Sequence, residues 1–558
     1  MKLFHVLAAS AAVMSIASAA SAEEHLIKTY YEFKKPRAIT PDLGEVFGVD
    51  NAGISDPVFN QGMIQAGFEG ISQYDVAAVG RNFIPPDTIG AVGRTQYMQF
   101  VNGGVAVYDK ATGTRQSFQS DLAFWSALGQ PGANGDSRVL YNAQANRWIA
   151  LSFAADARNI QIAVSKTADA NGPWQATQFQ GYAGLGFGGT ADYPTLAMDT
   201  NAIYIGTNNF APATNGGANS FRGTTLNVIP LSDLFNKTGP TVANNVKFET
   251  PFNSASSGND FTRGFAIQGV NSREVTTTGN IIAASINDYG LTRYDVLNAG
   301  TAGAVRTATA STTIGTTYTD NAAGRQPSVA IPANQRIIDT FGDQISSSAF
   351  ENDGKIYSVH TVTPLGGQFT QVRVTILDSL TNAVLSETTI GDSTHDYYQG
   401  SLSVNSIGQV VVAYNRSGLD PTDGRITLAA RTFMTTAIGG LNSTGAEIVL
   451  RVSDTDDYHN GSLFGQTFAG RQRWADYATV TTDPTSFHTF WVSGTFAREY
   501  NNAAGGHPGG TGGSRWGTYI AAINVGGVPE PTTWAMLIIG FGLVGAQARR
   551  SRSGYATA

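Results

Sequence analysis

Asp476-Tyr477-Ala478-Thr479-Val480-Thr481-Thr482-Asp483, followed by Thr489-Phe490-Trp491-Val492, is the stretch from which the fold can be inferred. It contains an aspartate, a short apolar strand, a polar turn and a second apolar strand. Short runs rich in Val, Thr and aromatic residues, bounded by Asp, Asn, Gly or Pro, are typical of β-strands. The stretch therefore predicts a β-hairpin that starts with an aspartate.

This pattern recurs along the chain at intervals of roughly 50 to 80 residues, which is the size of one four-stranded propeller blade. A degenerate copy starts near Arg263, and the clear copies start at Asp87, Asp136, Asp192, Asp343, Asp396 and Asp476. We therefore predict an all-β fold, a β-propeller of six to eight blades and most simply about seven. A β-sandwich array is an alternative. A β-helix would require a shorter and stricter period.

The composition favours short strands over helices. The chain has 558 residues, with 64 glycines, 14% charged residues and no cysteine. Glycine favours tight turns, whereas the Lys and Glu residues of helix surfaces are sparse. Leu231–Phe235 is expected to form a single helical turn. The lack of cysteine excludes disulfides and thiolate chemistry, and the net charge of −7 argues against nucleic-acid binding.

The N-terminal region has features of export. Residues 1–22 begin with Met1-Lys2, continue with small apolar residues and end in Ala20-Ser21-Ala22. This order is typical of a cleavable signal peptide, with a retained anchor as the alternative. Residues 23–78 are expected to be an extended lead segment that wraps the body or supplies a closing strand. Residues 79–526 are expected to be the propeller body.

The C-terminal residues 527–558 contain three parts in order. They are the triplet Pro529, Glu530 and Pro531, an uncharged run to Ala548, and a basic end with Arg549, Arg550 and Arg552. A helix over the uncharged run would be about 27 Å long, enough for a thin bilayer core. Arginines prefer the cytoplasmic side, so they would stop a single transmembrane helix there and leave the preceding chain outside.

This tail, in which Pro529-Glu530-Pro531 is followed by Thr-Thr-Trp-Ala-Met and the basic end, resembles the PEP-CTERM sorting signal of bacterial envelope proteins. The resemblance implies that an exosortase-type membrane enzyme cuts near the triplet. It also implies an exported protein of the cell envelope or the extracellular space, transiently anchored by its C-terminal helix and linked to extracellular polysaccharide. A plain C-terminal anchor is the alternative.

The segment Val164–Trp174 resembles the turn between outer strands in sialidase-like β-propellers, where Ser, Asp and Gly shape a hairpin and a Trp packs nearby. Its spacing departs from the standard Asp-box, Ser-x-Asp-x-Gly-x-x-Trp, so we interpret it as structural. The nucleophile elbow Gly-x-Ser-x-Gly, the Walker loop and His-Glu-x-x-His are absent from the sequence.

The recurring aspartates are the main candidates for a site. In equivalent positions, they would form a ring at one end of the propeller. Such a ring could bind a carbohydrate or a cation, and catalysis would need two carboxylates at a defined separation. The simpler interpretation is that each aspartate caps a turn by accepting backbone N–H hydrogen bonds. The ring consists of Asp87, Asp136, Asp192, Asp343, Asp396 and Asp476.

Two further groups have a possible binding role. Asp454, Asp456 and Asp457 lie in an acidic loop that could bind calcium, although it lacks the distal Glu of an EF-hand, and a solvated turn is the simpler reading. Four tryptophans could stack on sugar rings or, more simply, pack between blades: Trp148, Trp474, Trp491 and Trp516.

These observations predict an exported propeller protein that is processed by an exosortase and acts without catalysis in adhesion or polysaccharide binding. The alternative is a secreted glycan-active hydrolase or lyase on the same scaffold. The expected partners are the exosortase, the bacterial membrane through the C-terminal helix and extracellular polysaccharide, with no nucleic acid. No cofactor is expected apart from calcium.

Overall fold

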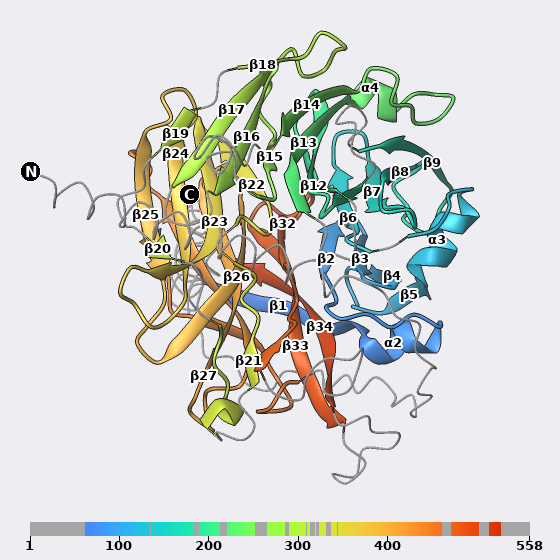
Figure 1. The fold of residues 1–558 in the computed structure, drawn as a ribbon. Coiled ribbons are helices and arrows are strands. Elements are labelled where there is room, and N and C mark those ends of the chain that lie inside the picture. Colours follow the sequence, from blue (N-terminus) through green and yellow to red (C-terminus); the bar gives the residue numbers. More distant parts are fainter. Residues whose placement is uncertain are drawn as a thin grey trace, which may run out of the picture.

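The computed structural model describes residues 62–133, 135–181, 189–211, 220–251, 265–284, 290–307, 310–312, 318–319, 323–330, 336–342, 344–459, 470–501 and 513–525. These residues form mainly β-strands, which are arranged as a β-propeller (Figure 1). The expected signal peptide and C-terminal helix lie outside the described residues.

Five separate sheets have the form of a propeller blade, with neighbouring strands antiparallel. The first contains β2 (Ile89–Val92), β3 (Gln96–Val101), β4 (Gly104–Asp109) and β5 (Arg115–Gln119), and the second β6 (Arg138–Asn142), β7 (Arg147–Phe153), β8 (Asn159–Ser165) and β9 (Trp174–Gln180). The third contains β10 (Thr190–Asp192), β11 (Ala197–Met198), β12 (Ala202–Ala211), β13 (Ser220–Pro230) and β14 (Val246–Pro251).

The other two of these five sheets come from the C-terminal half of the chain, and one of them also includes an N-terminal strand. One contains β26 (His395–Val404), β27 (Gln409–Gly418), β28 (Thr427–Thr435), β29 (Leu441–Ser443) and β30 (Ile448–Val452). The other contains β32 (Thr479–Thr482), β33 (Thr489–Asn501), β34 (Gly513–Asn524) and β1 (Met63–Ser72).

A sixth sheet has ten strands. It joins two antiparallel meanders through a parallel pairing of β15 with β22 (Val270 with Ala349). The first meander contains β15 (Gln268–Ser272), β16 (Thr278–Ala284), β17 (Leu291–Leu297) and β18 (Val305–Arg306), with β19 (Ala310–Thr312) beside β17. The second contains β22 (Ala349–Asn352), β23 (Lys355–Pro364), β24 (Gln371–Asp378) and β25 (Val384–Ile390), with β20 (Tyr318–Thr319) beside β23.

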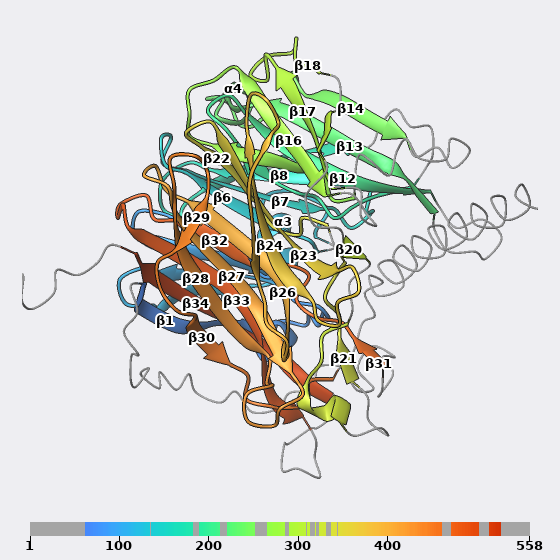
Figure 2. The ribbon, with the colours of Figure 1, turned by 90° about the vertical axis from the view of Figure 1, so that its left-hand side faces the viewer.

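The last sheet is closed by the N-terminal strand. β1 pairs with β34 from Met63–Asn524 to Ser72–Gly517, so segments from opposite ends of the described chain lie side by side (Figure 2). β1 and the following helix α2 (Gln73–Ala78) lie in the expected lead segment, residues 23–78, and both contact β34.

Helices are few and short in the described ranges. α2 starts with a capping box, in which the Ser72 side chain and Asp75 satisfy each other's backbone N–H groups. α3 (Asp121–Ala127) is capped by Ser120, and α4 (Leu231–Leu234) forms the single turn expected at Leu231–Phe235. Two smaller elements are the 3-10 helix η2 (Pro327–Ala330) and the parallel pair β21 (Arg336–Ile338) with β31 (Gly470–Gln472).

In the first sheet, burial decreases from the axis to the rim. Every residue of β2 and β3 is buried, whereas β5, at the outer edge of the same sheet, has none. The second strands of the sheets, such as β27 with Val410–Tyr414, contain continuous apolar runs because neighbouring sheets cover both of their faces. One core cluster, for example, packs Val411 and Leu428 against Val492 and Ile523 of the next sheet. Burial of such faces supplies the main driving force for folding.

Candidate functional site: the central channel

The inner strands lie around the centre of the molecule (Figure 1). They line a small cavity, which we call the channel. The cavity has a volume of about 150 Å³. Its lining includes residues of β2, β6, β11, β15, β22, β26 and β32. β15 and β22 run parallel, so their N-terminal ends lie at the same end of the channel. Asp87, Asp136 and Tyr477, which precede β2, β6 and β32, likewise lie near one another.

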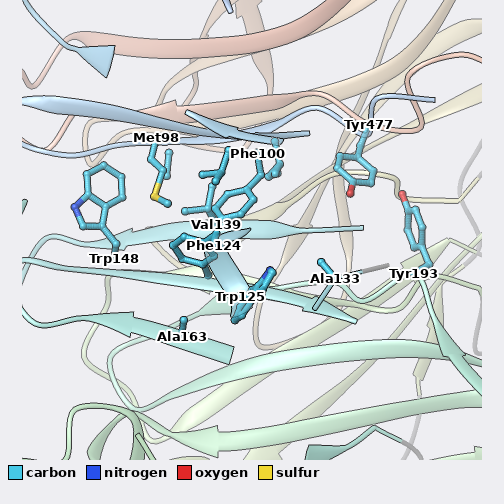
Figure 3. Close-up of a cluster of buried hydrophobic side chains, with 14 of the residues drawn as sticks. Met98, Phe100, Phe124, Trp125, Ala133, Val139, Trp148, Ala163, Tyr193 and Tyr477 are labelled. Carbon is cyan, nitrogen blue, oxygen red and sulfur yellow. The ribbon is translucent and has the colours of Figure 1, made fainter. Parts of the chain in front are cut away.

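The N-terminal end is closed by buried side chains. Asp87, Asp136 and Asp476 each precede an inner strand, adopt a positive φ and are at most 1% exposed. The Tyr193 and Tyr477 rings lie beside each other with centroids 5.8 Å apart (Figure 3). We call this end, formed by these five residues with Arg138, Asp339, Phe341 and Arg473, the plug.

The plug is held together by a buried ionic network. Arg473 donates to Asp476 at 2.6 Å and to Asp339 at 3.0 Å, and all three side chains are at most 1% exposed. Arg471 donates to the other oxygen of Asp339. Burial alone would raise the pKa of Asp339, but the charges of Arg471 and Arg473 hold it below its ordinary value. These carboxylates are therefore committed to arginines within the protein.

A second arginine lies against the aromatic part of the plug. The guanidinium of Arg138 lies 3.6 Å from the ring centre of Tyr477 and 5.0 Å from that of Tyr193. The hydroxyl of Tyr477 donates to the Ser137 carbonyl at 3.2 Å and that of Tyr193 to the Ser346 carbonyl at 2.9 Å. Burial raises the pKa of both tyrosines above its ordinary value, so their hydroxyls stay protonated at neutral pH.

The other expected ring members have different surroundings. Asp192 is buried at the end of β10, next to Tyr193. Asp396 is buried in β26, where it accepts from the backbone N–H groups of Arg325 and Thr370 and pairs with the Arg325 guanidinium at 2.9 Å. Asp343 lies outside the described residues. The structure thus brings Asp87, Asp136 and Asp476 to the plug, while Asp396 belongs to a separate ion pair.

The open end of the channel contains charged groups that the sequence did not reveal. Arg273, just after β15, donates to Thr482 Oγ1 at the end of β32. Glu351 in β22 accepts from Asn280 Nδ2 at 3.1 Å. Burial, with a smaller contribution from the charge of Glu274, raises the pKa of Glu351 above its ordinary value. No sequence motif marks these residues, because only the fold brings the ends of distant inner strands together.

Two of the three carboxylates in the acidic loop form ion pairs with arginines. Asp454 pairs with Arg451 at 2.8 Å, Asp457 pairs with Arg336, and Asp456 is exposed. Within the described ranges, no group of three or more His, Cys, Asp or Glu side chains is arranged to hold a metal ion. Calcium binding at Asp454, Asp456 and Asp457 stays a prediction.

The four tryptophans considered for sugar stacking are buried. Trp148, Trp474 and Trp516 are 0% exposed and Trp491 is 3% exposed. The Trp148 indole donates to the Ala168 carbonyl at 2.8 Å, inside the Val164–Trp174 hairpin. These rings therefore pack within the core in this structure, as the simpler interpretation proposed.

Comparison with known proteins identifies the C-terminal end of the chain. Residues 527–552 match the PEP-CTERM protein-sorting motif. Proteins that carry this motif are exported and sorted to the cell surface, and the motif implies processing by an exosortase. The processing residues Pro529, Glu530 and Pro531 and the arginines Arg549, Arg550 and Arg552 lie outside the described residues. Among the helices that the structure describes, none is both long and apolar enough to span a membrane.

No curated protein matches the chain. Several solved structures are similar to it. A protein of unknown function from Dyadobacter fermentans DSM 18053 is 13% identical, with a TM-score of 0.34, over 78% of this chain and 94% of that one. Drosophila Semaphorin 1b is 9% identical over 83% and 87% of the two chains (TM-score 0.36). Trypanosoma rangeli sialidase is 9% identical over 75% and 56% (TM-score 0.31).

Proposed function

We propose that the body has seven four-stranded blades, with β15–β18 and β22–β25 as two blades joined by the parallel pairing of β15 with β22. Two observations support this count. Each of these meanders has four consecutive antiparallel strands. A non-glycine residue with positive φ recurs before or within each proposed inner-strand region: Asp87, Asp136, Tyr193, Ala266, Phe341, Gln399 and Asp476.

We further propose that this exported protein binds extracellular polysaccharide without catalysis. The observation that carries the proposal is the closed plug, which commits Asp476 and Asp339 to Arg473 and leaves a cavity of about 150 Å³. Small-molecule sites usually have about 300–1,000 Å³. A hydrolase that used the aspartate ring would need accessible carboxylates in a deep pocket. The polysaccharide class comes from the sorting motif and the envelope location.

Affinity electrophoresis of the full-length protein in detergent, in gels that contain a bacterial exopolysaccharide, tests this proposal. Retarded migration without release of reducing sugars is the expected result. Unchanged migration with a panel of such polysaccharides would contradict binding, and steady sugar release would contradict the non-catalytic part.

A hydrolase with its site at the open end is the second candidate. Glu351 has a raised pKa and lies near Glu274, and such a pair could divide the roles of acid and base. If sugar release is observed, Glu351→Gln is expected to lower the rate by at least a hundredfold, since general acid catalysis contributes about 10²–10⁴-fold. A Glu351→Gln variant that retained the full rate of sugar release would contradict a hydrolase site at the open end.

Processing is proposed to occur at the triplet Pro529, Glu530 and Pro531. Replacing Pro529 and Pro531 with alanine is expected to leave the precursor uncut in the producing cells, as measured by the mass of the membrane-associated protein. Arg549→Ala serves as the matched control outside the triplet and is expected to allow cutting. Normal maturation of the double variant would contradict cleavage at this triplet.

A further inference from the structure

The outer edge of the second sheet carries a groove that differs from the channel. It has a volume of about 420 Å³ and lies between the end of α3, the start of β9 and the loop after α4. Figure 1 shows α3 and β9 side by side at the rim of the molecule. The volume is within the range of about 300–1,000 Å³ that is usual for small-ligand sites, whereas that of the channel is not.

Trp174 lies on the wall of this groove. Of the six tryptophans that the structure describes, it alone is partly exposed. Its indole Nε1 donates to the Ala170 carbonyl at 2.9 Å, and its ring contacts Phe124 edge-on with centroids 5.4 Å apart. The polar atom of the indole is thus satisfied inside the protein, and the ring is fixed in orientation before any ligand arrives.

The opposite wall is a rigid loop. The Thr241 N–H donates to the Asp233 carbonyl at 3.0 Å, and the Asp233 carboxylate accepts two hydrogen bonds from Asn244 at 2.8 Å. Gly239 has a φ of +124°, and a Cβ there would lie 3.2 Å from Gln175 Nε2. This position therefore favours glycine, which leaves room for the Gln175 amide.

The chemistry of the lining selects the ligand. None of the nine lining residues is charged. Within the described part of the chain, the Gln175 and Thr241 side chains have no hydrogen-bond partner. A neutral pyranose ring matches these lining residues. Its C–H face can stack on an indole, and its hydroxyl groups can form hydrogen bonds with amide and hydroxyl side chains.

We infer that this groove binds a neutral sugar ring of a polysaccharide, with Trp174 as the stacking platform and Gln175 and Thr241 as polar partners. The inference rests on the proposed function for the ligand class and adds the place of binding. It assigns to Trp174 a role beyond the structural one that the hairpin pattern indicated.

The test is equilibrium dialysis of the full-length protein in detergent with cellohexaose, maltohexaose and mannohexaose, each alone. Wild-type protein is expected to bind at least one of them. Trp174→Ala is expected to weaken this binding at least tenfold. Phe487→Ala, which removes a half-exposed aromatic ring outside the groove, and Thr482→Val in the channel are matched controls that are expected to bind as the wild type does.

Circular dichroism shows whether Trp174→Ala is folded. If it is not, Gln175→Ala replaces it, with an expected threefold or larger weakening. Equal binding by the folded groove variants would overturn the inference while leaving the proposed function intact. No binding of any oligosaccharide or polysaccharide by the wild type would overturn both.

Discussion

The two ends of the central channel are built from the same inner strands but have different chemistry. At the N-terminal end, Asp339, Arg473 and Asp476 form ion pairs that are at most 1% exposed. At the C-terminal end, Arg273 is exposed and Glu351 is half-buried. Three of the recurring aspartates therefore lie at the buried end of the channel, whereas Arg273 and Glu351 at the other end belong to no repeat in the sequence.

The difference has a physical reason. A buried charge must be paired with good geometry, because the cost of removing it from water is otherwise several kcal/mol. The plug meets this requirement at Asp339 with Arg471, Arg473 and the Phe341 backbone N–H, and at Asp476 with Arg473. At the open end Arg273 is exposed and its charge is screened by solvent, so its replacement is expected to have little effect on folding.

The largest effect is expected from breaking the plug. Arg473→Met would leave Asp339 and Asp476 buried beside one positive charge fewer, and a loss of about 3–5 kcal/mol in the free energy of unfolding is expected. Arg273→Met at the open end is the matched control, with a change within about 0.5 kcal/mol. Urea-induced unfolding of the two variants measures both values.

Similar losses for both arginine variants would contradict the distinction between the ends. A small loss for Arg473→Met alone would mean that Asp339 and Asp476 become neutral or reach water in the folded state. Arg473→Lys separates charge from geometry, since lysine keeps the charge but cannot donate in a fork to two carboxylates.

The sequence was informative where a local pattern repeats. The copies that start at Asp87, Asp136 and Asp476 each lie directly before an inner strand, because a turn with positive φ enters the strand in these three copies. The blade-like sheets and the single turn at α4 followed from the same local signals of strand and turn.

The parts that the sequence did not reveal depend on long-range packing. β1 closes the last sheet by pairing with β34, some 450 residues away along the chain, and no local signal in Met63–Ser72 specifies that partner. The pairing of Asp396 with Arg325, and the approach of Arg273 to Thr482, likewise depend on the closed ring of sheets. The groove at Trp174 brings together three segments that are distant in the sequence.

A smaller effect on the free energy of unfolding is expected from removing one tyrosine hydroxyl at each end of the channel. Tyr477→Phe removes a buried hydrogen bond to the Ser137 carbonyl and is expected to cost about 0.5–1.5 kcal/mol in the free energy of unfolding. Tyr141, which lines the channel in β6, donates to Asn146 Oδ1 at 3.2 Å and is only partly buried. Tyr141→Phe is therefore expected to cost less. The reverse order in urea-induced unfolding would show that the plug contains water near Tyr477.

The smallest expected effect is the pH dependence of stability that comes from Glu351 at the open end of the channel. The pKa of Glu351 is raised by burial and by Glu274, so the folded protein holds this proton to a higher pH than the unfolded chain does. Stability contributed by this group is therefore lost as pH rises from the ordinary glutamate value of about 4.3 through the raised value. Glu351→Gln removes this loss, and the variant is expected to gain melting temperature over the wild type as pH rises from 3 to 8.

Glu274→Gln gives the matched comparison. It removes the neighbouring charge but leaves the burial of Glu351, so it is expected to shift the pH dependence of the melting temperature in the same direction by a smaller amount. In the Glu351→Gln background, Glu274→Gln should lose most of this effect, because the two groups act through one interaction. Additive shifts would show that the two carboxylates do not interact, and the open end would then lack the coupled pair on which the hydrolase alternative depends.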